Sequence, residues 1–197
     1  MSDFPPGGQI KPINGIDLYF ETYGEGPAML LLHGFMGSGA DWGQVFKIPP
    51  EGYRSIFPDL RGHGRSTNPT GTFTFQQSAR DMFGLLDALN ITKYSAIGLS
   101  GGAQTLLHMA IQQPDRIGAM VIVSGGHYFP KEARAFMRGF SLETLSFAEL
   151  QAMRERHKYG EEQLRMLLTQ ARGFQTSYDD MSFTPPHLGT ITARTLL

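Results

Sequence analysis

One serine lies in a glycine-rich stretch where an apolar run gives way to a helical pattern. The stretch YSAIGLSGGAQTLLHMA covers residues 94–110 and places Ser100 in a Gly-x-Ser-x-Gly pentapeptide, between Gly98 and Gly102. Glycines lack a Cβ, so a strand and a helix can approach closely around a serine whose hydroxyl projects from a strained turn. Such a hydroxyl attacks carbonyl carbon atoms when a base activates it. Ser100 is therefore the candidate nucleophile, and the alternative is a serine that only caps the helix.

Backbone N–H groups that would stabilise an oxyanion are expected at two places. The N–H of Gly101, directly after Ser100, belongs to the start of the expected helix, where the helix dipole favours negative charge. His33, Gly34 and Phe35 follow the apolar run PAMLLL, and an N–H in this loop is the second candidate. Taken alone, this loop would equally suit a glycine-rich turn without chemistry.

A third polar segment, FPDLRGHGRS, covers residues 57–66 and also follows an apolar run. It contains Asp59, Arg61, His63 and Ser66, which are residue types found in active sites. We interpret the segment as a structural turn, because its glycines punctuate it at short intervals. His63 is expected to pack in this turn and not to act as a base.

The candidate site residues must be positioned by the strands and helices of the fold. Short apolar runs and helical patterns alternate along the chain. Buried strands are expected in PAMLLLHG, RSIFPDL, YSAIGLS and IGAMVIVSG. The segment GIDLYFETYGEG alternates apolar and polar residues, so the sheet is expected to begin there with an antiparallel strand. The segment TFQQSARDMFGLLDALN has helical spacing, and Thr74 with Gln77 forms a possible capping box. The fold class is therefore α/β, with a mainly parallel sheet and flanking helices.

The pattern of residues changes after SGGHYFP, from alternating strands and helices to helices alone. Residues 131 to about 172 carry charge-rich helical patterns with no strand between them, which predicts an inserted helical cap. The expected division is a core over residues 1–129, the cap over 130–185 and the start of a returning core segment over 186–197. The final ITARTLL has the pattern of a strand that is just beginning.

Composition excludes several classes of function. The chain has 197 residues, 41% of them hydrophobic, which is enough for one globular domain with a sizeable core. A net charge of -1 does not favour binding to nucleic acid. The chain has no cysteine, so disulfides, thiolate metal sites and a cysteine nucleophile are excluded. No secretory signal or membrane-spanning run is apparent, so a cytoplasmic location without membrane contact is expected.

Three motifs in this order, HGFMGS, DLRGHGRS and GLSGG, resemble those of the α/β-hydrolase superfamily. The resemblance covers residues 16 to about 126 closely and the expected cap more loosely. It implies that Ser100 is the nucleophile and that Phe35 and Gly101 supply the N–H groups of the oxyanion hole. Similar dehalogenases and epoxide hydrolases have an aspartate at the nucleophile position. The serine therefore favours acyl chemistry on a carboxylic ester, and this mechanism implies neither a metal ion nor an organic cofactor.

The resemblance ends before two of the family's catalytic residues. In the family the acid and the histidine follow the serine, each after a later strand of the core. This chain ends in ARTLL. We therefore expect an incomplete core, truncated before the acid and the histidine, and impaired hydrolysis. His127 and His187 follow the sheet and the expected cap, and either is a candidate substitute base.

Two functions of different class follow. The first is a serine hydrolase acting on small carboxylic esters through an acyl-enzyme. The second is a non-catalytic protein of the same fold that binds a small molecule or another chain. An exposed sheet edge at residues 117–125, the cap or the terminal TARTLL is expected to pair with a second copy or with a companion chain.

Overall fold

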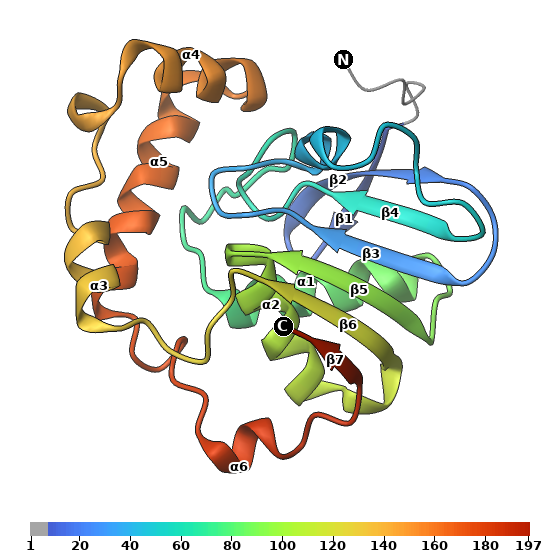
Figure 1. Ribbon diagram of the computed structural model, residues 1–197. Coiled ribbons are helices and arrows are strands. Elements are labelled where there is room, and N and C mark those ends of the chain that lie inside the picture. Colours follow the sequence, from blue (N-terminus) through green and yellow to red (C-terminus); the bar gives the residue numbers. More distant parts are fainter. Residues whose placement is uncertain (1–7) are drawn as a thin grey trace.

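The computed structural model describes residues 8–197, and within them seven strands form one sheet (Figure 1). The sheet order is β1-β2-β4-β3-β5-β6-β7. The strands are β1 (Gly8–Ile13), β2 (Ile16–Tyr23), β3 (Ala28–Leu32), β4 (Arg54–Pro58), β5 (Tyr94–Leu99), β6 (Ile117–Val123) and β7 (Arg194–Leu196). β1 and β2 pair antiparallel, β2 pairs antiparallel with β4, and all other pairs are parallel. The structure confirms the α/β class.

The sheet begins earlier than the sequence predicted. It was expected to begin in the segment that forms β2, and β1 precedes that segment. β1 and β2 form a hairpin whose turn is Asn14–Gly15, and both residues have positive φ, 46° and 78°. Two consecutive residues with positive φ match the twist of antiparallel strands, and Asn-Gly is the dipeptide that adopts them most readily. β1 was missed because its sequence GQIKPI is mostly exposed and contains a proline.

Two helices, α1 (Phe75–Ala88) and α2 (Gly101–Gln112), pack against one face of the sheet (Figure 1). The N-terminus of α1 is capped as expected by Thr74, whose side chain accepts a hydrogen bond from the N–H of Gln77 at 3.0 Å. The side chain of Gln77 does not complete a capping box, and its amide nitrogen donates to Asp81 at 3.1 Å. A short 3-10 helix, η2 (Pro114–Arg116), leads from α2 into β6.

The other face of the sheet has a lighter cover. There Leu31, Trp42 and Phe57 form a smaller cluster under the 3-10 helix η1 (Gly39–Gln44), with Ile97 partly buried against it. At the far edge β7 pairs with β6 through residues 119–121 and 194–196, so the edge strand of the described sheet is β7. All three residues of β7 are exposed. The terminal residues therefore form the strand that their pattern predicted.

Residues 131–176, here called the helical segment, contain helices and turns and no strand. The helices are α3 (Lys131–Met137), η3 (Leu142–Thr144), α4 (Phe147–Arg156), α5 (Gly160–Gly173) and η4 (Phe174–Thr176). They stand together beside the sheet, toward the ends of β3, β5 and β6 at which the strand arrows point, and the chain then returns through α6 (Pro185–Leu188) to β7 (Figure 1). The helical pattern predicted from residue 131 is confirmed.

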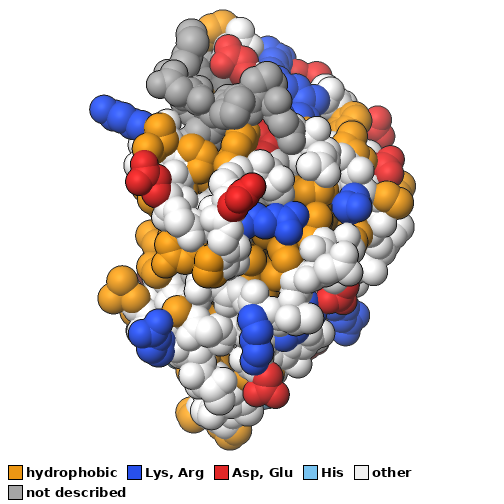
Figure 2. Space-filling model, turned by 90° about the vertical axis from the view of Figure 1, so that its right-hand side faces the viewer, with side chains coloured by type: hydrophobic (Ala, Val, Ile, Leu, Met, Phe, Trp, Pro, Cys, Tyr) orange, Lys and Arg blue, Asp and Glu red, His pale blue; other side chains and the backbone are white. Residues whose placement is uncertain are grey.

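The side of the molecule that Figure 2 shows carries acidic and basic side chains interspersed with hydrophobic ones. No helix within residues 8–197 has the length and apolarity needed to cross a membrane.

Candidate active site

Ser100 lies in a strained turn between β5 and α2. Its φ of 48° and ψ of -112° are unfavourable for a residue with a Cβ. A Cβ on Gly98 would lie 2.6 Å from the carbonyl oxygen of Gly102, and one on Gly102 would lie 2.3 Å from that of Leu32. Both glycines are therefore required by close packing, as the pentapeptide predicted.

The side chain of Ser100 is available for chemistry. The residue is exposed, and its side chain makes no capping hydrogen bond to α2. Ser100 occupies the N-cap position of α2, but its side chain does not cap the helix. The backbone holds the turn instead, because the N–H of Ser100 donates to the carbonyl of Val123 at 2.8 Å.

The two residues predicted to supply the oxyanion donors are neighbours at this turn. A Cβ built on Gly101 would lie 2.8 Å from the backbone nitrogen of Phe35. A Cβ built on Gly34 would lie 3.6 Å from the Cβ of Ser100. The structure thus brings Ser100, Phe35 and Gly101 together, although they come from loops after two different strands.

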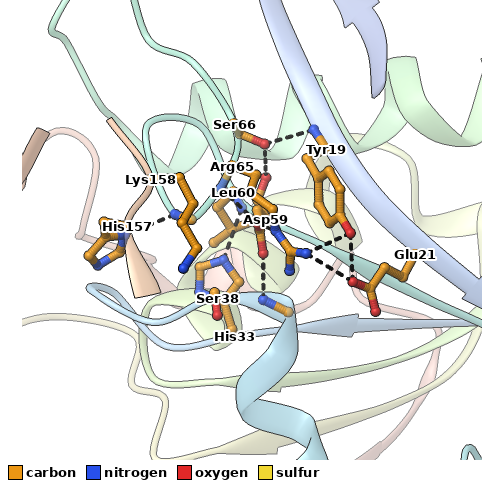
Figure 3. Close-up of polar contacts among 12 residues, drawn as sticks. Tyr19, Glu21, His33, Ser38, Asp59, Leu60, Arg65, Ser66, His157 and Lys158 are labelled. Carbon is orange, nitrogen blue, oxygen red and sulfur yellow. Dashed lines mark hydrogen bonds and ion pairs between the residues drawn. The ribbon is translucent and has the colours of Figure 1, made fainter. Parts of the chain in front are cut away.

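His33 and Asp59 hold the loop that carries Phe35 (Figure 3). The N–H of Leu60 donates to Nε2 of His33 at 2.9 Å, so Nδ1 carries the proton and donates to the carbonyl of Gly34 at 2.8 Å. Burial lowers the pKa of His33, which favours this neutral form. Asp59 accepts a hydrogen bond from the N–H of Gly39 at 2.7 Å. These contacts fix both ends of the loop.

The segment 57–66 is structural, as predicted. His63 is fully buried, and its Nδ1 donates to the carbonyl of Arg61 at 2.9 Å. Its ring lies edge-on to Phe35 with 4.7 Å between centroids, and burial lowers its pKa well below the usual value. Arg61 pairs with Asp81 at 2.8 Å beneath the turn. Ser66 donates to the carbonyl of Asp59 at 2.6 Å (Figure 3).

His157, from the helical segment, joins the two loops. Its Nδ1 accepts from the N–H of Gly64 at 2.9 Å, and its Nε2 donates to the carbonyl of Met36 at 3.1 Å. Met36 has a φ of 64° in the loop that carries Phe35, so His157 stabilises a peptide in an unfavourable conformation. Burial lowers the pKa of His157 to about 4, and the ring is therefore neutral at pH 7.

A cavity of about 210 Å³ opens at Ser100. Phe35, Ser100 and Gln104 line it from the core side, and Phe136, Met137, Phe140 and Phe174 line it from the helical segment. Among the described residues that line it, only Ser100 and Gln104 have polar side chains. Gln104 was not singled out in the sequence, although it is a polar residue four positions after Ser100 in an otherwise mainly apolar helix.

Aromatic contacts and one buried arginine hold the helical segment against this cavity. Phe174 packs on Phe35 and Phe75 with ring centroids 4.7 and 4.8 Å apart. Arg134, only 7% exposed, donates to the carbonyls of Phe129 and Phe174 at 2.9 and 3.0 Å. The two ends of the segment are thereby joined at the cavity.

A larger cavity of about 700 Å³ lies elsewhere, between the β1–β2 turn, residues 66–71 and α5. It does not reach Ser100, and its polar lining includes Gln163, whose side chain is already hydrogen-bonded to backbone groups. The strained turn at Ser100, and not cavity size, therefore marks the candidate site.

A profile of the family described as alpha/beta hydrolase fold matches residues 27–181. The chain belongs to this family. An epoxide hydrolase of Caballeronia sordidicola is 38% identical over 128 residues, which are 64% of this chain and 39% of that protein. Epoxide hydrolase 3 of Siraitia grosvenorii is 36% identical over 130 residues, 64% of this chain and 41% of that protein. The chain thus spans about two fifths of the length of these relatives.

Solved structures of the family share the fold. The enol-lactonase from Burkholderia xenovorans LB400 superimposes with a TM-score of 0.72 at 21% identity, over 95% of this chain and 79% of that one. At this identity the likeness concerns the fold alone. Among residues 8–197 of this hydrolase-fold chain, no group of three or more histidine or acidic side chains could hold a metal ion.

None of the six histidines lines the Ser100 cavity. His108 donates from Nε2 to the carbonyl of Asp180 at 2.8 Å, on the far part of α2. The two candidate substitute bases are exposed: His127 packs on Tyr128, and His187 contacts Thr184. In the described part of the chain, the structure brings no histidine to the nucleophile.

Proposed function

We propose that Ser100 is the nucleophile of a serine hydrolase that acts on small carboxylic esters, cyclic esters included, through an acyl-enzyme. The observation that carries the proposal is the strained, exposed Ser100 beside the backbone N–H groups of Phe35 and Gly101. In the first step the hydroxyl oxygen attacks the ester carbonyl, and the two N–H groups stabilise the oxyanion. The bond to the alcohol oxygen then breaks, and the alcohol leaves with the proton that the hydroxyl has lost. Water cleaves the acyl-serine to a carboxylic acid and restores the hydroxyl.

The identity of the nucleophile separates this chemistry from that of the relatives named as epoxide hydrolases. A carboxylate that opens an epoxide becomes an ester, which water can cleave. A serine that opened an epoxide would become an ether, which water does not cleave readily. Ser100 therefore supports acyl transfer, in which its own product is an ester.

The helical segment is proposed to be the cap of this site, within the boundaries 130–185 and between core segments 1–129 and 186–197. Its side chains Phe136, Met137, Phe140 and Phe174 supply one wall of the cavity. An apolar wall suits a small acyl or alcohol group of the substrate.

Hydrolysis by the 197-residue chain is expected to be slow. A serine hydroxyl is a weak nucleophile without a base, and the structure places none of the six histidines at Ser100. Removing a member of such a catalytic set typically lowers the rate by several orders of magnitude. That no histidine of the described residues lines the Ser100 cavity also favours the alternative function, a non-catalytic small-molecule-binding protein.

A fluorophosphonate probe with peptide mapping tests the nucleophile. We expect slow covalent labelling at Ser100, abolished by Ser100→Ala and retained in the matched control Ser124→Ala. Ser124 also has a positive φ, 52°, but does not line the cavity. Absence of label at Ser100 would refute the nucleophile and leave the binding function.

A p-nitrophenyl ester assay tests the expected impairment. We expect turnover far below the ordinary enzyme range of about 1 to 1000 per second. Turnover within that range, abolished by Ser100→Ala, would show that a base reaches Ser100.

The other expectations about partners and location stay predictions. They are a cytoplasmic location, a small-molecule ester as substrate, no binding to nucleic acid or membranes, and no need for a cofactor.

A further inference from the structure

Gln104 is a buried polar side chain whose oxygen, Oε1, finds no partner among residues 8–197. The residue is 5% exposed. Leaving a buried acceptor unpaired costs about 1–3 kcal/mol. Such a group in a native structure requires an explanation.

Packing alone does not explain a glutamine at this position. Ala103, Leu106 and Leu107 beside it on α2 are all buried and apolar. A methionine has nearly the same shape as glutamine and would fill the same space without an unpaired oxygen. The glutamine therefore provides something other than volume.

The position of Gln104 relates it to the nucleophile. It lies four residues after Ser100 on α2, a rise of about 6 Å along a helix, and residues at this spacing share one helix face. Long helical side chains lean toward the N-terminus of the helix, which here is the end that carries Ser100. Both residues line the same cavity, whose other side-chain walls are apolar.

We propose that Gln104 is a specificity-determining residue that accepts a hydrogen bond from a hydroxyl group of the substrate, a few bonds from the reacting carbonyl. The proposal deepens the function proposed above and rests on it. Oε1 is enclosed beside Gly125, where a Cβ would lie 3.4 Å from it. The terminal torsion of a glutamine is soft, so the amide can rotate to turn Oε1 toward a donor in the cavity. A substrate without that donor would leave the oxygen unpaired.

A matched pair of ligands tests this proposal without requiring turnover. α-Hydroxy-γ-butyrolactone and α-methyl-γ-butyrolactone have nearly the same shape and differ in one hydroxyl. NMR titrations of the Ser100→Ala protein would give their dissociation constants with no reaction at Ser100. We expect the hydroxylated lactone to bind about tenfold tighter, as one added hydrogen bond predicts. Gln104→Met should abolish this preference.

The control is the same substitution at a second buried glutamine. Among the described residues, the Oε1 of Gln170 is also without a partner, but its Nε2 donates to the carbonyl of Gly71 at 2.8 Å and the residue does not line the Ser100 cavity. Gln170→Met should therefore keep the preference for the hydroxylated lactone. Gln104→Met should leave the melting temperature unchanged or raise it, because it removes an unpaired acceptor.

Three results would overturn the proposal: equal affinities for the two lactones, a preference that survives Gln104→Met, or no binding of the hydroxylated lactone in the cavity. None of these depends on covalent chemistry at Ser100. The probe-labelling experiment therefore tests the nucleophile separately.

Discussion

Replacing Asp180 with alanine should destabilise the protein strongly, because this carboxylate holds the first turn of α1. Its oxygens accept hydrogen bonds from the N–H groups of Phe75 at 2.7 Å and Gln76 at 3.0 Å. The side chain is 10% exposed, and one oxygen lies 3.4 Å from Nε2 of His108. One side chain from the segment after α5 thus contacts both helices that pack on the sheet.

The magnitude follows from these contacts. A hydrogen bond to a charged group contributes about 1.5–3 kcal/mol, and the lower part of that range applies here because the Gln76 contact is at the surface. Asp180→Ala should therefore lower the free energy of unfolding by about 3 kcal/mol. For a chain of this size the melting temperature should fall by about 6 to 12 °C. Asp180→Asn should lose about half as much, because one carboxylate oxygen becomes a donor.

Urea denaturation followed by circular dichroism measures these differences. The neighbouring Asp179 is exposed, so Asp179→Ala should change stability by less than about 0.5 kcal/mol. Thr74→Ala removes the ordinary N-cap of the same helix and should cost about 1 kcal/mol. Hydrogen exchange at the Phe75 and Gln76 amides should accelerate in Asp180→Ala. A loss no larger than that of Thr74→Ala would refute the reasoning.

Three further predictions concern other parts of the molecule. Burial lowers the pKa of His157 to about 4, and an unfolded histidine titrates near 6.5, so the unfolded chain binds more protons between these values. Stability should therefore fall as the pH falls from about 6.5 to about 4, by at most about 3 kcal/mol from this residue. His157→Gln should weaken that dependence in urea titrations, and identical pH profiles would contradict it. Ser100→Gly should raise the free energy of unfolding by about 1 kcal/mol, because glycine tolerates the φ of 48°. Ser100→Ala keeps the backbone strain and serves as the comparison. Equal melting temperatures for the two variants would argue against strain at this position. The exposed sheet edge at β7 (Arg194–Leu196) should pair with a second chain, so light scattering should give a mass above the 21.8 kDa of one chain. A monomer at all concentrations would contradict this association.

Local features of this fold could be read from the sequence because they depend on neighbouring residues. The glycines around Ser100 predicted a tight turn, and the structure shows that neither Gly98 nor Gly102 has room for a Cβ. Thr74 predicted the start of α1, and its side chain caps that helix. Apolar runs predicted four of the seven strands as buried elements of a mainly parallel sheet. Each of these predictions needs only the periodicity or turn chemistry of a few consecutive residues.

Only the tertiary structure decided which distant groups meet. His157 contacts Gly64 across 93 positions, and Asp180 contacts Phe75 across 105. Gln104 is one helical turn from Ser100 in sequence, yet its unpaired oxygen became apparent only when its surroundings were known. A sequence pattern shows which side of an element is buried. The partner that a buried polar group meets depends on how separate elements pack, and that packing is a property of the whole chain.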